Sequence, residues 1–243
     1  MINNLLLLSG NDIPFIGGQG SIHQPTIREI AYLGEETFFT GCEILNFSKN
    51  LLSEEDKMNL EDQTNFDILI AILREQNAVM QKNRNCVEMT LALLFPSYLI
   101  TIKEQEIVME KEEHKIIINN ENFEEFKSII SSMSSYKQGA ESSELNPSGV
   151  MAKRIAEKLK KRHQKLAENK PEQKIDILSR YISILAVGEA KDMNALFNYT
   201  MYQLFDEFKR YELKMHNDTY VQACLAGAKD LKEVEDWMQD IHS

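Results

Sequence analysis

The sequence has few of the features that mark secreted or membrane proteins. Its three cysteines are an odd number with wide spacing, which matches no disulfide framework and no zinc pattern, so buried reduced thiols are expected. The longest apolar stretches, 90–95 and 182–187, are far shorter than the roughly 20 residues of a membrane-spanning helix. Leu5–Leu8 has no basic residues before it and no cleavage site after it, unlike a signal peptide. We therefore expect a cytoplasmic protein that has no membrane partner.

The sequence also lacks the patterns of catalytic and metal sites. Its five histidines have no spacing, to one another or to cysteine, that suits a shared metal ion. The segment Gly17–Gly20 is not followed by the Lys-Ser/Thr pair of a phosphate-binding loop, so a turn is the favoured interpretation. As a catalytic base, His23 would need a nucleophile and an orienting acid, and the sequence alone suggests neither, so packing at a helix entrance is favoured over catalysis. We expect no catalytic residue, no cofactor and no metal, and a protein that works by binding other proteins.

Positive charge is scarce in the first part of the chain. The formal net charge is −11, which disfavours general binding to a phosphate backbone. Residues 1–150 hold 11 Lys and Arg against 23 Asp and Glu, whereas 151–243 hold 16 against 15. This difference in charge indicates two structural units.

Periodicity predicts helices and one small sheet in the first 135 residues. Residues 1–22 are predicted to be extended, as two short strands or as an arm with a turn. Thr26 and Glu29 have the spacing of a capping box, as do Thr64 and Asp67, so each pair predicts a helix start. Helices are predicted over 35–52, 66–73, 87–95 and 123–133. The runs 98–103, 106–111 and 115–118 predict a three-stranded antiparallel meander.

A small polar stretch after residue 134 predicts a linker that is followed only by helices. The expected division is a mixed α+β domain over 1–135, a linker over 136–146 and a helical domain over 147–243. Its later helices are predicted over 174–187, over 192–215 and around Trp237. Aromatic and methionine residues crowd the 192–215 helix so widely that its apolar face is predicted to be central or shared with a partner. The expected fold class is α+β and predominantly helical, with N-terminal helices, a small antiparallel β-meander and an all-helical C-terminal unit.

Basic residues are concentrated in the segment 153–165, which holds seven Lys and Arg with only Glu157 opposing them. Such a run can bind nucleic acid, an anionic surface or an acidic protein. It lacks the aromatic residues that single-strand binders use for stacking. We favour a protein contact through Lys160, Lys161 and Arg162. A nucleic-acid-binding regulator that uses a basic helix at 150–168 stays as the third functional alternative.

Three segments resemble proteins encoded among the tail genes of tailed bacteriophages. They are Ile22–Ile30 (IHQPTIREI), Gly34–Phe39 (GEETFF) and Val234–Ile241 (VEDWMQDI). The resemblance implies a non-catalytic tail-assembly chaperone that holds a tail component, such as the tape measure protein or a baseplate component, in the host cytoplasm. The alternative is a structural tail or baseplate subunit that is retained in the virion.

The expected partners are therefore a phage tail protein and, as a further alternative, a second copy of this chain. Methionine, of which the chain has 11 residues, gives an apolar surface that adapts to amphipathic helices. The residues expected to bind the partner are His23, Thr26, Glu29, Lys160, Lys161, Arg162, Tyr199, Tyr202 and Trp237.

Overall fold

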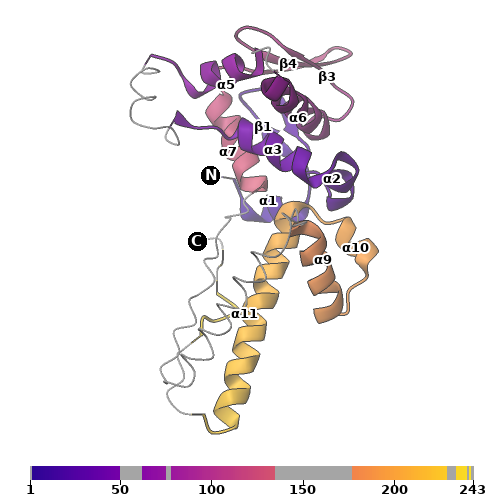
Figure 1. Ribbon diagram of the computed structural model, residues 1–243, viewed down its shortest axis with the longest axis vertical. Helices are drawn as coiled ribbons and strands as arrows, with labels where there is room; N and C mark the ends of the chain where they lie inside the picture. Colours follow the sequence, from indigo (N-terminus) through magenta and orange to yellow (C-terminus); the bar gives the residue numbers. More distant parts are fainter. Residues whose placement is uncertain are drawn as a thin grey trace. The chain divides into compact units, whose positions relative to one another are not determined.

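The computed structural model describes residues 2–49, 62–74, 78–134, 177–228, 234–239 and 241 (Figure 1). Within them the protein is α+β and predominantly helical, which confirms the predicted fold class. Met1–Ser135 and Leu178–Ser243 belong to one compact unit, and their described residues share one hydrophobic core. The basic segment 153–165 and the predicted linker lie outside the described residues. The division into 1–135, 136–146 and 147–243 therefore stays a prediction.

The chain starts with a helix, so the prediction of an extended segment at Leu5–Leu8 was wrong. Helix α1 (Asn4–Ser9) begins where the Asn3 side chain accepts a hydrogen bond from the backbone N–H of Leu5, and it ends at Gly10, whose φ is 71°. A cap at each end and the helix preference of leucine outweigh the strand-like look of a short apolar run. The strands β1 (Ile13–Phe15) and β2 (Gly20–Ile22) then form the predicted antiparallel hairpin.

In the described residues, the helices predicted to start at Thr26 and to span 35–52, 66–73, 87–95 and 123–133 are present, with some ends shifted. Helix α3 ends before the predicted residue 52, and α6 begins before the predicted residue 87. The helices are α2 (Ile27–Leu33), α3 (Glu35–Leu45), α5 (Asn65–Arg74), α6 (Ala78–Leu94) and α7 (Phe123–Met133). The α3 and α6 backbones approach closely at Gly41, where a Cβ atom would lie 2.1 Å from Thr90 Oγ1 and 2.7 Å from the Cys86 carbonyl oxygen.

The predicted meander is confirmed as a three-stranded antiparallel sheet in the order β3-β4-β5. Its strands are β3 (Leu99–Ile102), β4 (Ile107–Lys111) and β5 (His114–Ile118). Ile107 lies opposite Ile102 on one side and Ile118 on the other, so isoleucines line up across one face of the sheet. That face joins the core.

The C-terminal helices differ from the prediction in one important way. Helix α9 (Ile177–Gly188) is present as expected, but the predicted single helix over 192–215 was wrong, because α10 (Met193–Phe197) and α11 (Met201–Leu225) are separate. The break arises because Thr200 caps a new helix together with Gln203. Residues 234–239 form a turn closed by the Gln239 N–H and the Asp236 carbonyl, so the short helix predicted around Trp237 is not found in this described stretch.

Phenylalanines form the centre of the core. Phe126, which is fully buried, lies 5.8 Å from Phe15 and 6.3 Å from Phe95 between ring centroids. The same cluster continues into α9, α10 and α11, which bury several large apolar side chains against it. These are Leu178, Ile182, Leu185, Leu196, Met201 and Leu204. The described C-terminal helices are therefore part of the same core as the N-terminal residues. In the described part of the chain, none of the helices has the length and apolar character needed to cross a membrane.

Candidate protein-binding surface

The segment around Thr26 connects α2 to the C-terminal helices. We call the contacts of Thr26 and Ile27 with Tyr199 and Thr200 the joint. The Ile27 N–H donates to the carbonyl of Tyr199 at 2.8 Å, and Thr26 pairs with Thr200 as an isolated antiparallel bridge. The N–H of His23 donates to the carbonyl of Leu94 at the end of α6 at 2.9 Å. The first segment of the phage resemblance therefore connects α6, α2 and the start of α11.

Two capping boxes meet at this joint. In α2, Glu29 Oε2 accepts from the N–H and the hydroxyl of Thr26 at 2.7 Å each, while the Glu29 N–H donates to Thr26 Oγ1 at 3.3 Å. In α11, the Thr200 N–H donates to Gln203 Oε1 at 2.8 Å, and the Gln203 N–H donates to Thr200 Oγ1 at 3.3 Å. The capping box predicted at Thr26 is confirmed. Because the two boxes lie side by side, the starts of both helices are fixed together.

Replacing Thr26 by alanine tests how much the joint contributes. We expect a loss of about 1–2 kcal/mol in the free energy of unfolding, because the N-cap acceptor and a donor to Glu29 both disappear. Thr64→Ala is the matched control, since Thr64 forms the same kind of box with Asp67 at an exposed site. Urea unfolding of both variants should show the larger loss for Thr26→Ala. Equal losses would mean that the joint adds nothing to the cap itself.

His23 lies between two carboxylates. Its Nδ1 is 3.0 Å from Asp12 Oδ1, and its Nε2 is 3.3 Å from Glu29 Oε2. Burial is the largest single influence and opposes the charged ring, but the hydrogen bonds and charges of the two acids together raise the pKa of His23 above its usual value. Burial also opposes the charge of Glu29, yet hydrogen bonds from Thr26 and His23 outweigh it and lower the pKa of that carboxyl.

The structure supplies an orienting acid for His23 that the sequence did not show. Asp12 is 11 residues away and reaches His23 only because the hairpin turns the chain back. The other ring nitrogen faces Glu29, which is a third ionisable group and not a hydroxyl or thiol nucleophile. The trio therefore holds the hairpin against α2, as expected of a histidine packed at a helix entrance.

The glycine-rich turn is held by the protein's own carboxylate. Glu125 of α7 accepts from the N–H groups of Ile16 and Gly17 at 3.0 and 2.9 Å. Asn122 donates to the Gly17 carbonyl at 2.9 Å, and a Cβ on Gly17 would lie 2.7 Å from Asn122 Cβ. The N–H groups of Ile16 and Gly17 are therefore engaged by Glu125 and that of Gln19 by the Ile16 carbonyl, and the turn docks the hairpin onto α7. This agrees with the interpretation of Gly17–Gly20 as a turn.

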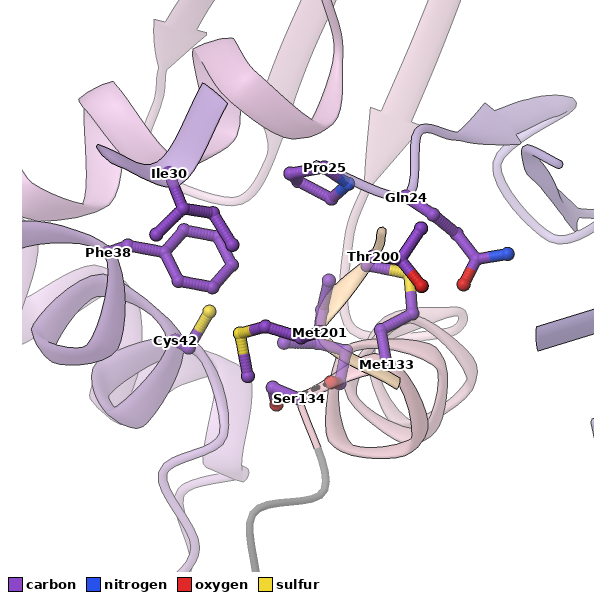
Figure 2. Close-up of a pocket in the computed structure, with 10 residues that line it drawn as sticks. Gln24, Pro25, Ile30, Phe38, Cys42, Met133, Ser134, Thr200 and Met201 are labelled. Carbon is purple, nitrogen blue, oxygen red and sulfur yellow. Dashed lines mark hydrogen bonds between the residues drawn. The ribbon is translucent and has the colours of Figure 1, made fainter. Parts of the chain in front are cut away.

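A small cavity lies beside the joint (Figure 2). Phe38 and Cys42 of α3 face Met201 of α11 across it, and Thr200 lies at its edge. Its volume of about 10 Å³ suits roughly one water molecule, whereas pockets for small molecules are typically about 300–1,000 Å³. The cavity is therefore a packing gap inside the core and offers no room for an organic ligand.

The cysteines behave partly as expected. Cys42 and Cys86 are buried, and burial raises the pKa of the Cys42 thiol to about 12. Cys224 is exposed on α11, which corrects the expectation that all three are buried. Within the described residues, no group of three His, Cys, Asp or Glu side chains is placed to hold a metal ion.

The predicted partner-binding residues fall into different environments. His23, Thr26 and Glu29 lie together at the joint, and Tyr199 adjoins them through its carbonyl while Lys191 Nζ lies 5.6 Å from its ring. Tyr202 is buried in the core. Trp237 is 37% exposed, and its carbonyl accepts from Arg210 of α11 at 3.0 Å. Lys160, Lys161 and Arg162 lie outside the described residues.

Among the described residues, α9 packs against the apolar face predicted within 192–215, and α11 continues past the predicted end to Leu225. In the first half of α11, Phe208 stacks on Tyr181 of α9 at 3.9 Å between ring centroids, and Phe205 meets the same tyrosine edge to face. Beyond Leu213, no residue of α11 is buried. The predicted helix ended at residue 215, so sequence reasoning missed most of this second half of α11, including Val221 and Leu225.

Three apolar side chains lie on that second half. Met215 and Val221 are each 45% exposed, and Leu225 is 84% exposed. At about 100° per residue they fall within roughly one third of the helix circumference. We call these three residues the distal face of α11.

The fold and this surface define a helix-rich α+β protein with an apolar helical face that its described neighbours leave open. Residues 169–242 match the model of a family described as the YomV second domain, which is phage-derived, from a Bacillus prophage. The match spans α9, α10 and α11 together with the Trp237 turn. No curated protein and no solved structure matches the chain significantly. The match agrees with the phage part of the resemblance and is not specific to tail assembly.

Proposed function

We propose that the protein is a non-catalytic phage tail-assembly chaperone that binds a tail component, such as the tape measure protein or a baseplate component, before assembly. The observation that carries the proposal is the distal face of α11, which lies inside the region matched by a phage-derived family. The three segments that resemble tail-gene proteins give the partner its class. One of these segments, Ile22–Ile30, contacts the start of α11 at the joint, and another, Gly34–Phe39, begins α3.

The length and exposure of the last turns of α11 favour a helical partner. Lys214–Leu225 continues α11 for about three turns without a buried residue, and isolated helices of this length are marginal in water. Packing of an apolar stripe against another amphipathic helix would stabilise these turns, and the flexible Met215 can adapt to different partner side chains. A long helical tail protein that aggregates on its own is the kind of partner that needs such a cover.

The test is recovery of the partner from cells in which the encoding phage is replicating. The tagged protein should co-purify with one tail component from the lysate and should be absent from purified virions by mass spectrometry. Stoichiometric presence in mature particles would overturn the chaperone proposal in favour of the structural subunit. Salt-sensitive recovery of nucleic acid in place of a tail protein would favour the regulator with the basic segment 153–165.

A variant of the distal face makes the test specific. Val221→Lys combined with Leu225→Lys should reduce recovery of the tail component about tenfold or more, since every 1.4 kcal/mol of lost apolar contact is tenfold in affinity. Val187→Lys is the matched control, because Val187 is 83% exposed on α9 within the same family match. If the control and the α11 variant lose the partner equally, the distal face is not the binding surface.

A further inference from the structure

Two carboxylates face the two nitrogens of one imidazole in this protein. Asp12, which precedes β1, faces Nδ1 of His23, and Glu29 of α2 faces Nε2. Ionised carboxylates only accept hydrogen bonds, whereas a neutral imidazole has one N–H donor and one lone pair. The charged ring, with two N–H donors, therefore satisfies both acids, and the neutral ring must turn a lone pair toward one of them.

We propose that His23 is a proton-dependent clamp between the start of the β-hairpin and the start of α2, closed when its ring is charged and loosened when the ring loses its proton. The clamp goes beyond the proposed chaperone function and does not depend on it. Its geometry rests on two contacts from different elements, with the hairpin side supplied by Asp12 and the helix side by Glu29.

The contact with Glu29 is the one that deprotonation breaks. Glu29 Oε2 already accepts two bonds of 2.7 Å from Thr26, and its 3.3 Å contact with His23 is the longest of the three. The neutral ring therefore keeps its N–H toward Asp12 at 3.0 Å and turns the Nε2 lone pair toward Glu29. This places a repulsive contact on the capping box that starts α2.

The capping box transmits the change to the joint. Thr26 bonds Glu29 through both its N–H and its hydroxyl, and the next residue, Ile27, donates to Tyr199 at the start of the C-terminal helices. On the α6 side, His23 meets only a backbone carbonyl, that of Leu94, among its described hydrogen bonds. The ionisable groups that face the ring are therefore Asp12 and Glu29, which are also the two that raise its pKa.

The sign of the pH dependence follows from these two acids. The pKa of His23 is raised in the folded state, so the clamp stabilises the fold fully below the pKa of the unfolded histidine and is lost as pH rises through the folded value. The pKa of Glu29 is lowered in the folded state. The stability that ionised Glu29 contributes is therefore present above the unfolded pKa of glutamate and is lost as pH falls through the folded pKa. The clamp is closed in the window between the folded pKa of Glu29 and that of His23.

Nuclear magnetic resonance of the full chain tests the clamp from about pH 5 to 9. The His23 ring should titrate with a pKa above about 6.5, and protection of the Ile27 N–H against exchange should fall through that pKa. After correction for base catalysis, the fall should be about tenfold for each unit by which the folded pKa exceeds the unfolded one. A pKa at or below the unfolded value, or protection that does not change through it, would overturn the clamp.

Variants separate the clamp from general pH effects. Asp12→Asn offers both an acceptor and a donor to the ring, so the pKa of His23 should fall and the pH dependence at Ile27 should shrink. His23→Gln should abolish that dependence if the variant folds, and Asp12→Asn serves if it does not. Asp218→Asn is the matched control, since Asp218 is exposed on α11. An unchanged pH dependence in Asp12→Asn would overturn the proposal.

Discussion

Phe126→Ala is expected to lower the free energy of unfolding by about 3–5 kcal/mol, the largest loss of any single truncation considered for this protein. Phe126 is fully buried, and its ring meets the rings of Phe15, Phe95 and Phe123 at centroid distances of 5.8, 6.3 and 6.4 Å. These neighbours come from the hairpin, the end of α6 and α7 itself. Truncation removes buried apolar area and leaves a cavity that three separate elements cannot all move to fill.

Denaturant unfolding followed by circular dichroism measures the loss. Leu99→Ala is the control, because Leu99 is 69% exposed on the edge strand β3 and its truncation should change stability by less than about 0.5 kcal/mol. A loss below about 2 kcal/mol for Phe126→Ala would show that the four rings do not form one packed centre.

Gly41→Ala is expected to destabilise the protein by about 1–3 kcal/mol, although the same change in an exposed helix stabilises by about 1 kcal/mol. The sign reverses because the new Cβ would lie 2.1 Å from Thr90 Oγ1 and 2.7 Å from the Cys86 carbonyl oxygen. The second atom belongs to the α6 backbone, which cannot move away as a side chain can. Helix α3 must therefore shift relative to α6.

A double variant tests this mechanism. Thr90 Oγ1 is buried without a hydrogen-bond partner in the described structure, so Thr90→Ala alone should cost only about 1 kcal/mol, for the buried methyl group that it removes. Combined with Gly41→Ala, it removes the closest contact and should recover part of the loss, which gives a coupling of about 0.5 kcal/mol or more. Strictly additive effects of the two substitutions would refute the steric explanation.

Sequence patterns predicted the helices and strands that are defined by interactions between residues close together in the sequence. Apolar spacing predicted the helix over 123–133, and the residues that carry it, Phe123, Phe126, Ile129, Ile130 and Met133, are all buried in α7. The capping boxes at Thr26 and Thr64 and the alternation in the meander were readable for the same reason, because a hydrogen bond or a period of a few residues defines each. Helix α1 was missed because its two caps are weaker patterns than the run of four leucines between them.

Contacts between distant residues could not be predicted. Asp12 reaches His23 through the hairpin, and Glu125 reaches the turn at Gly17 from more than 100 residues away. The break between α10 and α11 lies at the Thr200–Gln203 capping box, whose local spacing was overlooked, whereas the bond from Ile27 to Tyr199 beside it could not be read from the sequence. Of the distal face, only Met215 lies within the predicted helix, whereas Val221 and Leu225 lie beyond its predicted end.

The joint also sets an order on biosynthesis. Thr26 and Thr200 pair although they are 174 residues apart in the sequence. The hydrophobic core is complete only after Met201 and Leu204 have been added to the chain. At a synthesis rate of about 5–20 residues per second, the ribosome needs roughly 3–14 s to travel from Ser135 to Leu204. During that interval the hairpin and α2 have left the ribosome without the side chains that complete their packing. The nascent chain is thus exposed to off-pathway association for seconds, and its yield in a heterologous host should depend on growth temperature and on the chaperones available there.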